Sequence, residues 1–121
     1  MSVLVWLGVG LLGGLGALGR FALDAVVSSR AGRRFPVGTL VVNLTGALAL
    51  GLLAGLPVTG RALLLAGTAT VGSYTTFSTW MLETHRLGED GELGPAAVNL
   101  VLSLMAGAAA AALGRAVGAA L

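Results

Sequence analysis

Residues 62–82 read ALLLAGTATVGSYTTFSTWML and contain no charged side chain. The stretch is long enough to cross a bilayer, which takes roughly 20 mostly apolar residues in a helix. Six of the seven residues 73–79 nevertheless carry a hydroxyl group. One or two hydroxyls in a membrane helix bond back to its own carbonyls, but six surround the helix, so some must face protein or water. We therefore predict a membrane-spanning helix that lines a polar interior.

Three further stretches without charge lie on either side of this one, at 1–19, 35–60 and 93–114. Together they predict an all-α membrane protein of the cell membrane, with a single domain over residues 1–121. Its four transmembrane helices are expected near residues 3–26, 37–56, 62–85 and 95–117. The short connections contain proline, glycine and most of the charged residues, so consecutive helices should be antiparallel neighbours.

The composition excludes several classes of protein. Hydrophobic residues make up 56% of the chain and charged residues 10%, whereas a soluble domain has about 25% charged residues. There is no cysteine, which excludes disulfides and thiolate metal sites. All seven basic residues are arginine, and the longest basic run is Arg33-Arg34, so we expect no nucleic-acid partner. No side chains have the spacing of a metal site or of a nucleophile with its base, so we do not expect an enzyme.

The N-terminal apolar stretch lacks a preceding positive segment, which favours a membrane span over a cleaved signal peptide. With four spans, four arginines fall on one side of the membrane and two on the other. The four are Arg30, Arg33, Arg34 and Arg86, and the two are Arg61 and Arg115. This weak bias places both termini outside, and it is small enough to permit insertion in both directions.

Pairs of glycines four residues apart recur in the predicted helices. They are Gly10 with Gly14, Gly51 with Gly55, and Gly114 with Gly118. Membrane helices associate where small residues let their backbones approach closely. We therefore predict tight helix packing at these pairs, in preference to a mere tolerance of the bilayer for glycine.

The hydroxyl-rich segment begins at Gly72, a residue that weakens a helix. Irregular backbone at membrane depth survives only where protein buries it or where it lines a cavity. Such backbone frees carbonyl oxygens, which suit a hard cation such as Na⁺. We therefore favour a broken third helix with a bound cation over a regular polar helix.

Polar side chains also lie in the second and fourth spans. Asn43 is in the middle of the second, with Thr39 one turn earlier on the same face. Its carboxamide either makes a hydrogen bond to a neighbouring helix, which would contribute about 1 kcal/mol of stability, or offers N–H donors to an anion that sheds water. Asn99 and Ser103 share one side of the fourth helix, as a polar track or as a contact between helices. The residues alone leave both alternatives open.

Phe77 and Trp80, three residues apart, project from one side of the third helix. Such residues usually pack in a core, but the edges of aromatic rings are electropositive and can contact a partly dehydrated anion. Arg20, near the end of the first span, has three interpretations. It snorkels to the interface, has a structural role by anchoring a loop or pairing with Asp24 four residues on, or attracts anions to a vestibule.

Three motifs occur in order along the chain. They are residues 13–20 (GGLGALGR), residues 35–43 (FPVGTLVVN) followed by Gly46, and residues 72–79 (GSYTTFST). Together they resemble the Fluc/CrcB family of fluoride channels. The resemblance covers essentially the whole chain, and the third motif is the most specific of the three.

The resemblance implies an antiparallel, dual-topology homodimer with two fluoride pores along the subunit interface and passive export of fluoride. It also implies a structural Na⁺ that is not transported, held by main-chain carbonyls at positions that match Gly72 and Thr75. The pore positions of the family match Asn43, Phe77, Trp80, Ser78, Thr79 and, on the fourth helix, Ser103. The arginine of the first helix matches Arg20.

The chain departs from the family's pattern at three positions. Trp80 replaces the second pore phenylalanine, Ser73 replaces a glycine, and Asn99 stands where a tyrosine can occur. The indole N–H of Trp80 is expected to alter its site. Some relatives pair two different subunits of fixed, opposite orientation, so a heterodimer with a paralogous subunit is an alternative.

Two other kinds of protein compete with the channel. A small multidrug exporter needs a carboxylate within the membrane, but residues 1–19 contain none and Asp24 lies near the end of a span. A subunit that only packs against other membrane proteins leaves the hydroxyls of residues 73–79 unexplained. The expected partners are therefore fluoride, the lipid bilayer and a second subunit.

Overall fold

The computed structural model describes residues 2–121, and within that range the regular elements are all helices. They are α1 (Val3–Ala31), α2 (Val37–Gly55), α3 (Gly60–Leu63), the π-helix η1 (Leu64–Val71), α4 (Gly72–Tyr74), α5 (Ser78–Glu89) and α6 (Leu93–Ala120). Of the described helices, α1, α2 and α6 are long and apolar enough to cross a membrane. The prediction of an all-α, multi-pass membrane protein is confirmed.

Local chemistry sets the limits of α1 and the start of α2. The Ser2 hydroxyl accepts a hydrogen bond from the Val5 N–H at 3.3 Å and caps the first turn of α1. The helix continues to Ala31, beyond the expected end at 26, and stops at Gly32, whose φ of 79° lies in the region that favours glycine. Pro36 directly precedes α2, where its missing N–H removes no helical hydrogen bond.

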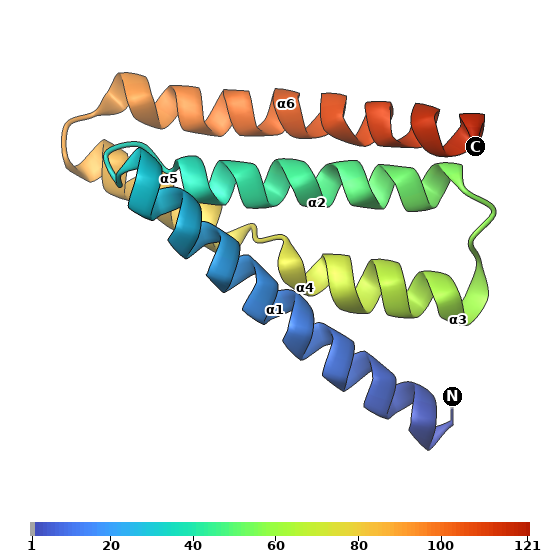
Figure 1. The fold of residues 1–121 in the computed structure, drawn as a ribbon. Coiled ribbons are helices and arrows are strands. Elements are labelled where there is room, and N and C mark those ends of the chain that lie inside the picture. The colour runs from blue at the N-terminus through green and yellow to red at the C-terminus, as the bar shows by residue number, and fades with distance from the viewer. Residues whose placement is uncertain (1) are drawn as a thin grey trace.

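The helices α2 and α6 run side by side for most of their length (Figure 1). A methyl group added to Gly51 would overlap the carbonyl of Ala111, and one added to Gly114 would overlap that of Leu48. The same holds for the second glycine of each pair, Gly55 and Gly118. Tight packing is therefore confirmed at these two pairs.

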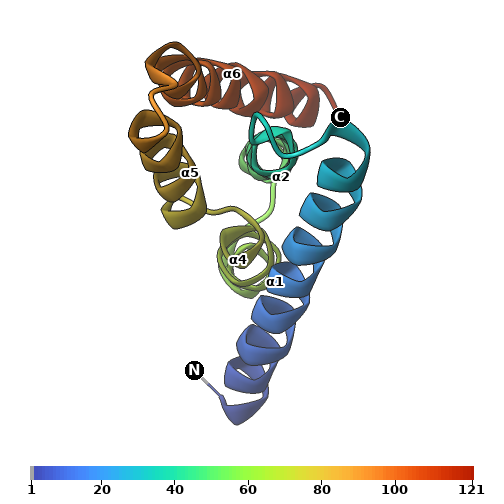
Figure 2. The ribbon, with the colours of Figure 1, turned by 90° about the vertical axis from the view of Figure 1, so that its left-hand side faces the viewer.

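The helix α1 crosses the others obliquely, and its N-terminal half extends away from α2 and α6 (Figures 1 and 2), while Gly8 in that half still lies against Leu65 of η1. Its middle meets η1 and α4, where Gly16 lies against the backbone of Thr70. At Gly10 and Gly14 an added side chain would meet nothing within 4 Å. The prediction of tight packing at that pair is therefore wrong for the chain by itself.

Four short helices follow one another between residues 60 and 89 (Figure 1). η1 has the wider π-helical turn, in which the Thr70 hydroxyl donates to the Leu65 carbonyl at 2.7 Å. Gly72 is helical, with φ of −60° and ψ of −39°. The chain leaves helical geometry at Thr75, whose ψ is 158°, and α5 begins at Ser78. The irregular residues are therefore 75–77, beyond the glycine at which we expected the weak point.

Candidate functional site

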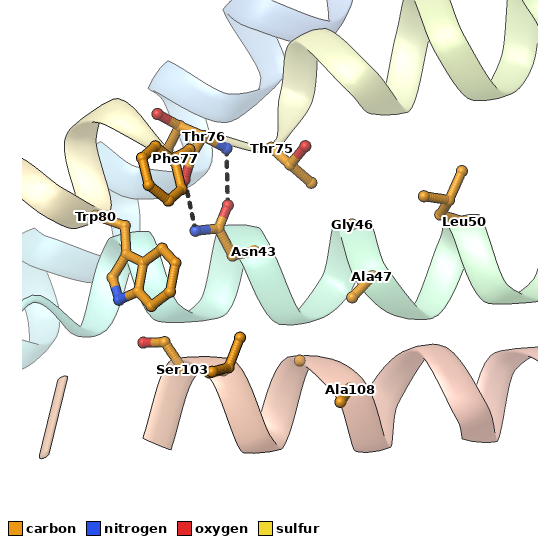
Figure 3. Close-up of a pocket in the computed structure, with 12 residues that line it drawn as sticks. Asn43, Gly46, Ala47, Leu50, Thr75, Thr76, Phe77, Trp80, Ser103 and Ala108 are labelled. Atoms are coloured by element: carbon orange, nitrogen blue, oxygen red, sulfur yellow. Dashed lines mark hydrogen bonds between the residues drawn. The ribbon is translucent and has the colours of Figure 1, made fainter. Parts of the chain in front are cut away.

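A side chain of α2 holds the irregular segment between α4 and α5. The Asn43 Nδ2 donates to the Thr76 carbonyl at 2.8 Å, and the Thr76 N–H donates to the Asn43 Oδ1 at 2.8 Å (Figure 3). One carboxamide thus satisfies both polar groups of a residue that has left the helix, as a low-dielectric environment requires. Of the two interpretations of Asn43, the structure therefore shows the hydrogen bond to a neighbouring segment. One of its two amide N–H groups makes no hydrogen bond within the described chain.

The hydroxyl of Thr76 starts the next helix. It accepts a hydrogen bond from the Thr79 N–H at 3.1 Å, in the first turn of α5. It also lies 3.4 Å from the Ser78 hydroxyl. Threonine is a favoured residue for capping a helix in this way. Thr76 is thus a central residue that was not predicted from the sequence. The available signal was its hydroxyl, three residues before an N–H of the first turn of α5, which is the spacing of a helix cap.

Two carbonyl groups lose their helical donors at the same place. In a continuous helix, the N–H groups of Thr76 and Thr79 would bond to the carbonyls of Gly72 and Thr75. Here the first donates to Asn43 and the second to the Thr76 hydroxyl. The Gly72 carbonyl receives only a 3.5 Å contact from the Thr75 hydroxyl. The oxygens at both expected cation positions are therefore free of strong backbone hydrogen bonds, which fits ligands of a hard cation.

Beside the irregular segment lies a cavity of about 450 Å³ between α2, α5 and α6 (Figure 3). Every side chain that lines it among the described residues is uncharged. The aromatic rings of Phe77 and Trp80 meet there edge to face, with centroids 5.6 Å apart and planes at 84°. The cavity thus combines amide, hydroxyl and ring-edge groups without a full charge.

The structure separates the predicted site residues into two groups. Asn43, Thr75, Phe77, Trp80 and Ser103 line the cavity. The other predicted residues, Gly72, Ser78, Thr79 and Arg20, are not among its lining residues. A methyl group on Gly46, which also lines the cavity, would overlap the Thr75 side chain, so α2 and the irregular segment approach closely there.

Sequence comparison adds a relationship to this geometry. Residues 7–115 match a family model described as CrcB-like protein, Camphor Resistance (CrcB). The chain belongs to the CrcB family. The resemblance predicted from the three motifs is thereby confirmed.

Relatives of this CrcB chain carry names that state an activity. "Fluoride-specific ion channel FluC 2" of Mycolicibacterium paratuberculosis is 58% identical over 114 residues, which cover 94% of this chain and 93% of the relative. A protein of the same name from Mycobacterium tuberculosis H37Rv is 56% identical, with 95% and 91% covered. "Fluoride-specific ion channel FluC 1" of Symbiobacterium thermophilum is 42% identical over 120 residues, with 93% and 96% covered.

Asn99 lies at the contact between α5 and α6 of the CrcB chain. Its side chain is 2% exposed, and its Nδ2 donates to the Thr84 hydroxyl at 2.8 Å. The Ser103 hydroxyl approaches its Oδ1 at 3.4 Å. Asn99 and Ser103 were interpreted either as a polar track or as a contact between helices. Asn99 makes a contact between helices, whereas Ser103 lines the cavity. No sequence pattern singles out Thr84.

The charged groups of the CrcB chain lie outside the uncharged cavity. Arg33, Arg86, Glu83 and Asp90 are among the residues that line a second cavity, of about 230 Å³. Over residues 2–121 the one contact between a basic and an acidic side chain is the exposed approach of His85 Nε2 to Glu89 Oε1 at 3.0 Å. Asp24 instead accepts a hydrogen bond from Ser28 at 3.1 Å. The suggested pairing of Arg20 with Asp24 is therefore absent from the described structure.

Proposed function

We propose that this CrcB-family protein is a fluoride-specific ion channel, through which fluoride leaves the cell passively and the cytoplasmic concentration stays low. The observation that carries the proposal is the identity of 58% over 94% of the chain to a relative named as a fluoride-specific ion channel. The uncharged cavity beside residues 75–77 supports it, because its groups have the chemistry that a small anion needs.

Fluoride is strongly hydrated, so a pore must replace its water with donors and still release it. The remaining amide N–H of Asn43 is such a donor beside the cavity. The hydroxyls of Thr75 and Ser103, whose contacts within the chain are long, at 3.3 and 3.4 Å, would turn toward the ion as further donors. The ring edges of Phe77 and Trp80 add weak positive potential without a fixed charge. We assign Ser78 and Thr79 to the approach from α5, and Arg20 to the vestibule or to a structural role.

We propose that two chains form the channel, inserted antiparallel to each other, with the second chain a copy of this one or a paralogous subunit. In each chain α3, η1, α4 and α5 together would form a broken third span, so that residues 1–121 make one four-helix domain. The cavity of one chain, about 450 Å³, far exceeds the roughly 30 Å³ of a water molecule. The Phe77 side chain is 70% exposed. A second chain over this face would narrow the path and cover the ring.

We propose further that a structural Na⁺, which is not transported, binds the carbonyl oxygens of Gly72 and Thr75. The support is that the usual helical donors to these oxygens bond elsewhere, to Asn43 and to the Thr76 hydroxyl. The bound cation would supply a fixed positive charge. The chain's own part is to present the oxygens, by holding Thr76 outside the helix.

Efflux from liposomes tests the proposed function. The purified protein is reconstituted alone in vesicles loaded with fluoride or with chloride, and efflux is followed with ion-selective electrodes. We expect fast fluoride efflux with valinomycin and K⁺ as the only means of charge balance, and little chloride efflux. A requirement for a proton gradient would favour the exporter instead. Folded protein without any fluoride flux would contradict a channel built from this chain alone and would favour one with a paralogous partner.

A further inference from the structure

A closed set of hydrogen bonds ties Trp80 to α6. Its indole Nε1–H donates to the backbone carbonyl of Asn99 at 3.1 Å. The Asn99 side chain donates in turn to the Thr84 hydroxyl at 2.8 Å, and that hydroxyl donates to the Trp80 carbonyl at 2.8 Å. Three residues from two helices thus form a ring of bonds around one side of the indole.

This ring of bonds uses the only hydrogen-bond donor of the indole. Because Asn99 is 2% exposed, water has little access to compete for these groups. Figure 3 shows the ring nitrogen of Trp80 turned away from Asn43, although the indole itself lines the cavity. Toward the cavity, Trp80 therefore presents carbon and C–H groups.

We propose that Asn99 and Thr84 are positioning residues that hold the Trp80 N–H away from the ion path, so that Trp80 contributes its ring alone. The inference rests on the proposed function of the cavity. An N–H bond to an anion is charge-assisted and about twice as strong as a neutral one. A free indole N–H in the path would therefore retain fluoride, whereas conduction requires its release. These hydrogen bonds allow tryptophan to line the ion path, where an aromatic side chain without a hydrogen-bond donor would otherwise be needed.

The first experiment observes the indole N–H itself. Trp6 and Trp80 are the two tryptophans of the chain, so Trp6→Phe leaves one indole for NMR in lipid nanodiscs. We expect added sodium fluoride to shift the Trp80 N–H resonance less than the C–H resonances of the ring edge that lines the cavity. In Thr84→Val the indole keeps its acceptor, the Asn99 backbone carbonyl, but the Asn99 side chain loses its bond to α5. Local opening, and with it the hydrogen exchange of the indole N–H, should therefore become about tenfold faster. The matched variant Thr84→Ser keeps the hydroxyl and should keep the slow rate.

Two results of the NMR experiment would overturn the proposal. A saturable shift of the Trp80 N–H resonance with fluoride that exceeds the shifts of the ring C–H resonances would make that group an ion ligand. Equal exchange rates in Thr84→Val and Thr84→Ser would remove the positioning role of the hydroxyl. Both results depend on the geometry around the indole, so they can be read whether or not the protein conducts.

The second experiment measures the ratio of fluoride to chloride efflux in a double-mutant cycle. Thr84→Val should lower the ratio about fivefold when Trp80 is present, a coupling of roughly 1 kcal/mol. In a Trp80→Phe background there is no N–H to misplace, so Thr84→Val should leave the ratio unchanged. An equal loss in both backgrounds would show that Thr84 supports only the fold, against the proposal. Absence of fluoride flux in every variant and in the unmodified protein would instead contradict the proposed function.

Discussion

Two of the contacts that helix α2 makes differ in what holds them together. Toward α6, glycines bring backbone against backbone, and among residues 2–121 no side-chain hydrogen bond joins the two helices. Toward the irregular segment, Asn43 makes two hydrogen bonds of 2.8 Å to Thr76. The first contact is stabilised by dispersion at short range. The second avoids the cost of unpaired polar groups in an apolar environment. The contact of α2 with α6 at the glycines (the glycine contact) should therefore be destabilised when side-chain atoms are added. The contact of Asn43 with Thr76 (the amide contact) should be destabilised when side-chain atoms are removed.

The largest effect is expected from filling the glycine contact. In Gly114→Leu the new side chain has no space, because even a methyl group overlaps the Leu48 carbonyl and backbone cannot move aside cheaply. Overpacking should cost about 3 kcal/mol or more and leave little folded protein. The thermal midpoint in detergent, followed by size-exclusion chromatography, measures this.

Gly94→Leu on the same helix is the control for this change. A side chain at Gly94 would meet nothing within 4 Å, so the midpoint should stay near that of the unmodified protein. Similar losses in both variants would mean that the close approach of α2 and α6 is not the cause.

A somewhat smaller effect is expected from emptying the amide contact. Asn43→Ala leaves the N–H and the carbonyl of Thr76 unpaired. An unpaired buried group costs about 1–3 kcal/mol, and these groups are part-buried, so we expect a loss of about 1–3 kcal/mol in unfolding free energy and no fluoride efflux. Unfolding in detergent with increasing denaturant gives the first quantity, and vesicle efflux gives the second.

Asn43→Asp refines this test, because a neutral carboxyl both donates and accepts as the amide does, whereas a carboxylate only accepts. Its stability should therefore be closer to that of the unmodified protein at pH 5 than at pH 8. An Asn43→Ala protein as stable as the original would contradict the role that we assign to the two bonds.

These two contacts also differ in how far the sequence predicts them. Glycines spaced four apart predicted the contact of α2 with α6, because both the spacing and the small size are local properties. Within the described residues of one chain, no helix packs at Gly10 and Gly14, and spacing does not say whether a neighbouring helix is present. The partner of Asn43 lies 33 residues away and uses backbone atoms, which every residue has. Sequence therefore indicated a polar contact at Asn43 without identifying Thr76.

The position of the irregular segment shows the same limit. Glycine is the residue with the weakest preference for helix, so Gly72 was the natural place for a weak point. In the structure Gly72 is helical, and Thr75 is the residue with extended backbone. Tertiary hydrogen bonds from Asn43 and the capping hydroxyl of Thr76 outweigh local preference there. The Thr84 and Asn99 contact was hidden likewise, because it joins residues 15 apart on separate helices.

A third variant tests the cap of α5 with a smaller expected effect. Thr76→Val removes the hydroxyl that accepts the Thr79 N–H and leaves the shape almost unchanged. Loss of such a group costs about 1–2 kcal/mol, and Thr76→Ser should recover most of it. Thermal midpoints of the two proteins provide the measurement. If valine and serine were equivalent, the cap would not stabilise α5.

The smallest effect on stability, and the clearest separation of stability from transport, is expected at Phe77. Its ring is 70% exposed in the chain and contacts Trp80 edge to face, so Phe77→Ile should cost less than about 1 kcal/mol. Isoleucine has no electropositive ring edge, so fluoride efflux should nevertheless fall by about tenfold, as for roughly 1.4 kcal/mol of lost ion stabilisation. Phe77→Tyr keeps the ring and should keep most of the flux. Parallel losses of stability and flux would make Phe77 a packing residue. Unchanged flux in both Phe77→Ile and Asn43→Ala would mean that the ion path does not run through this cavity. The contacts of Asn43 with Thr76 and of Phe77 with Trp80 would then stabilise the fold without taking part in transport.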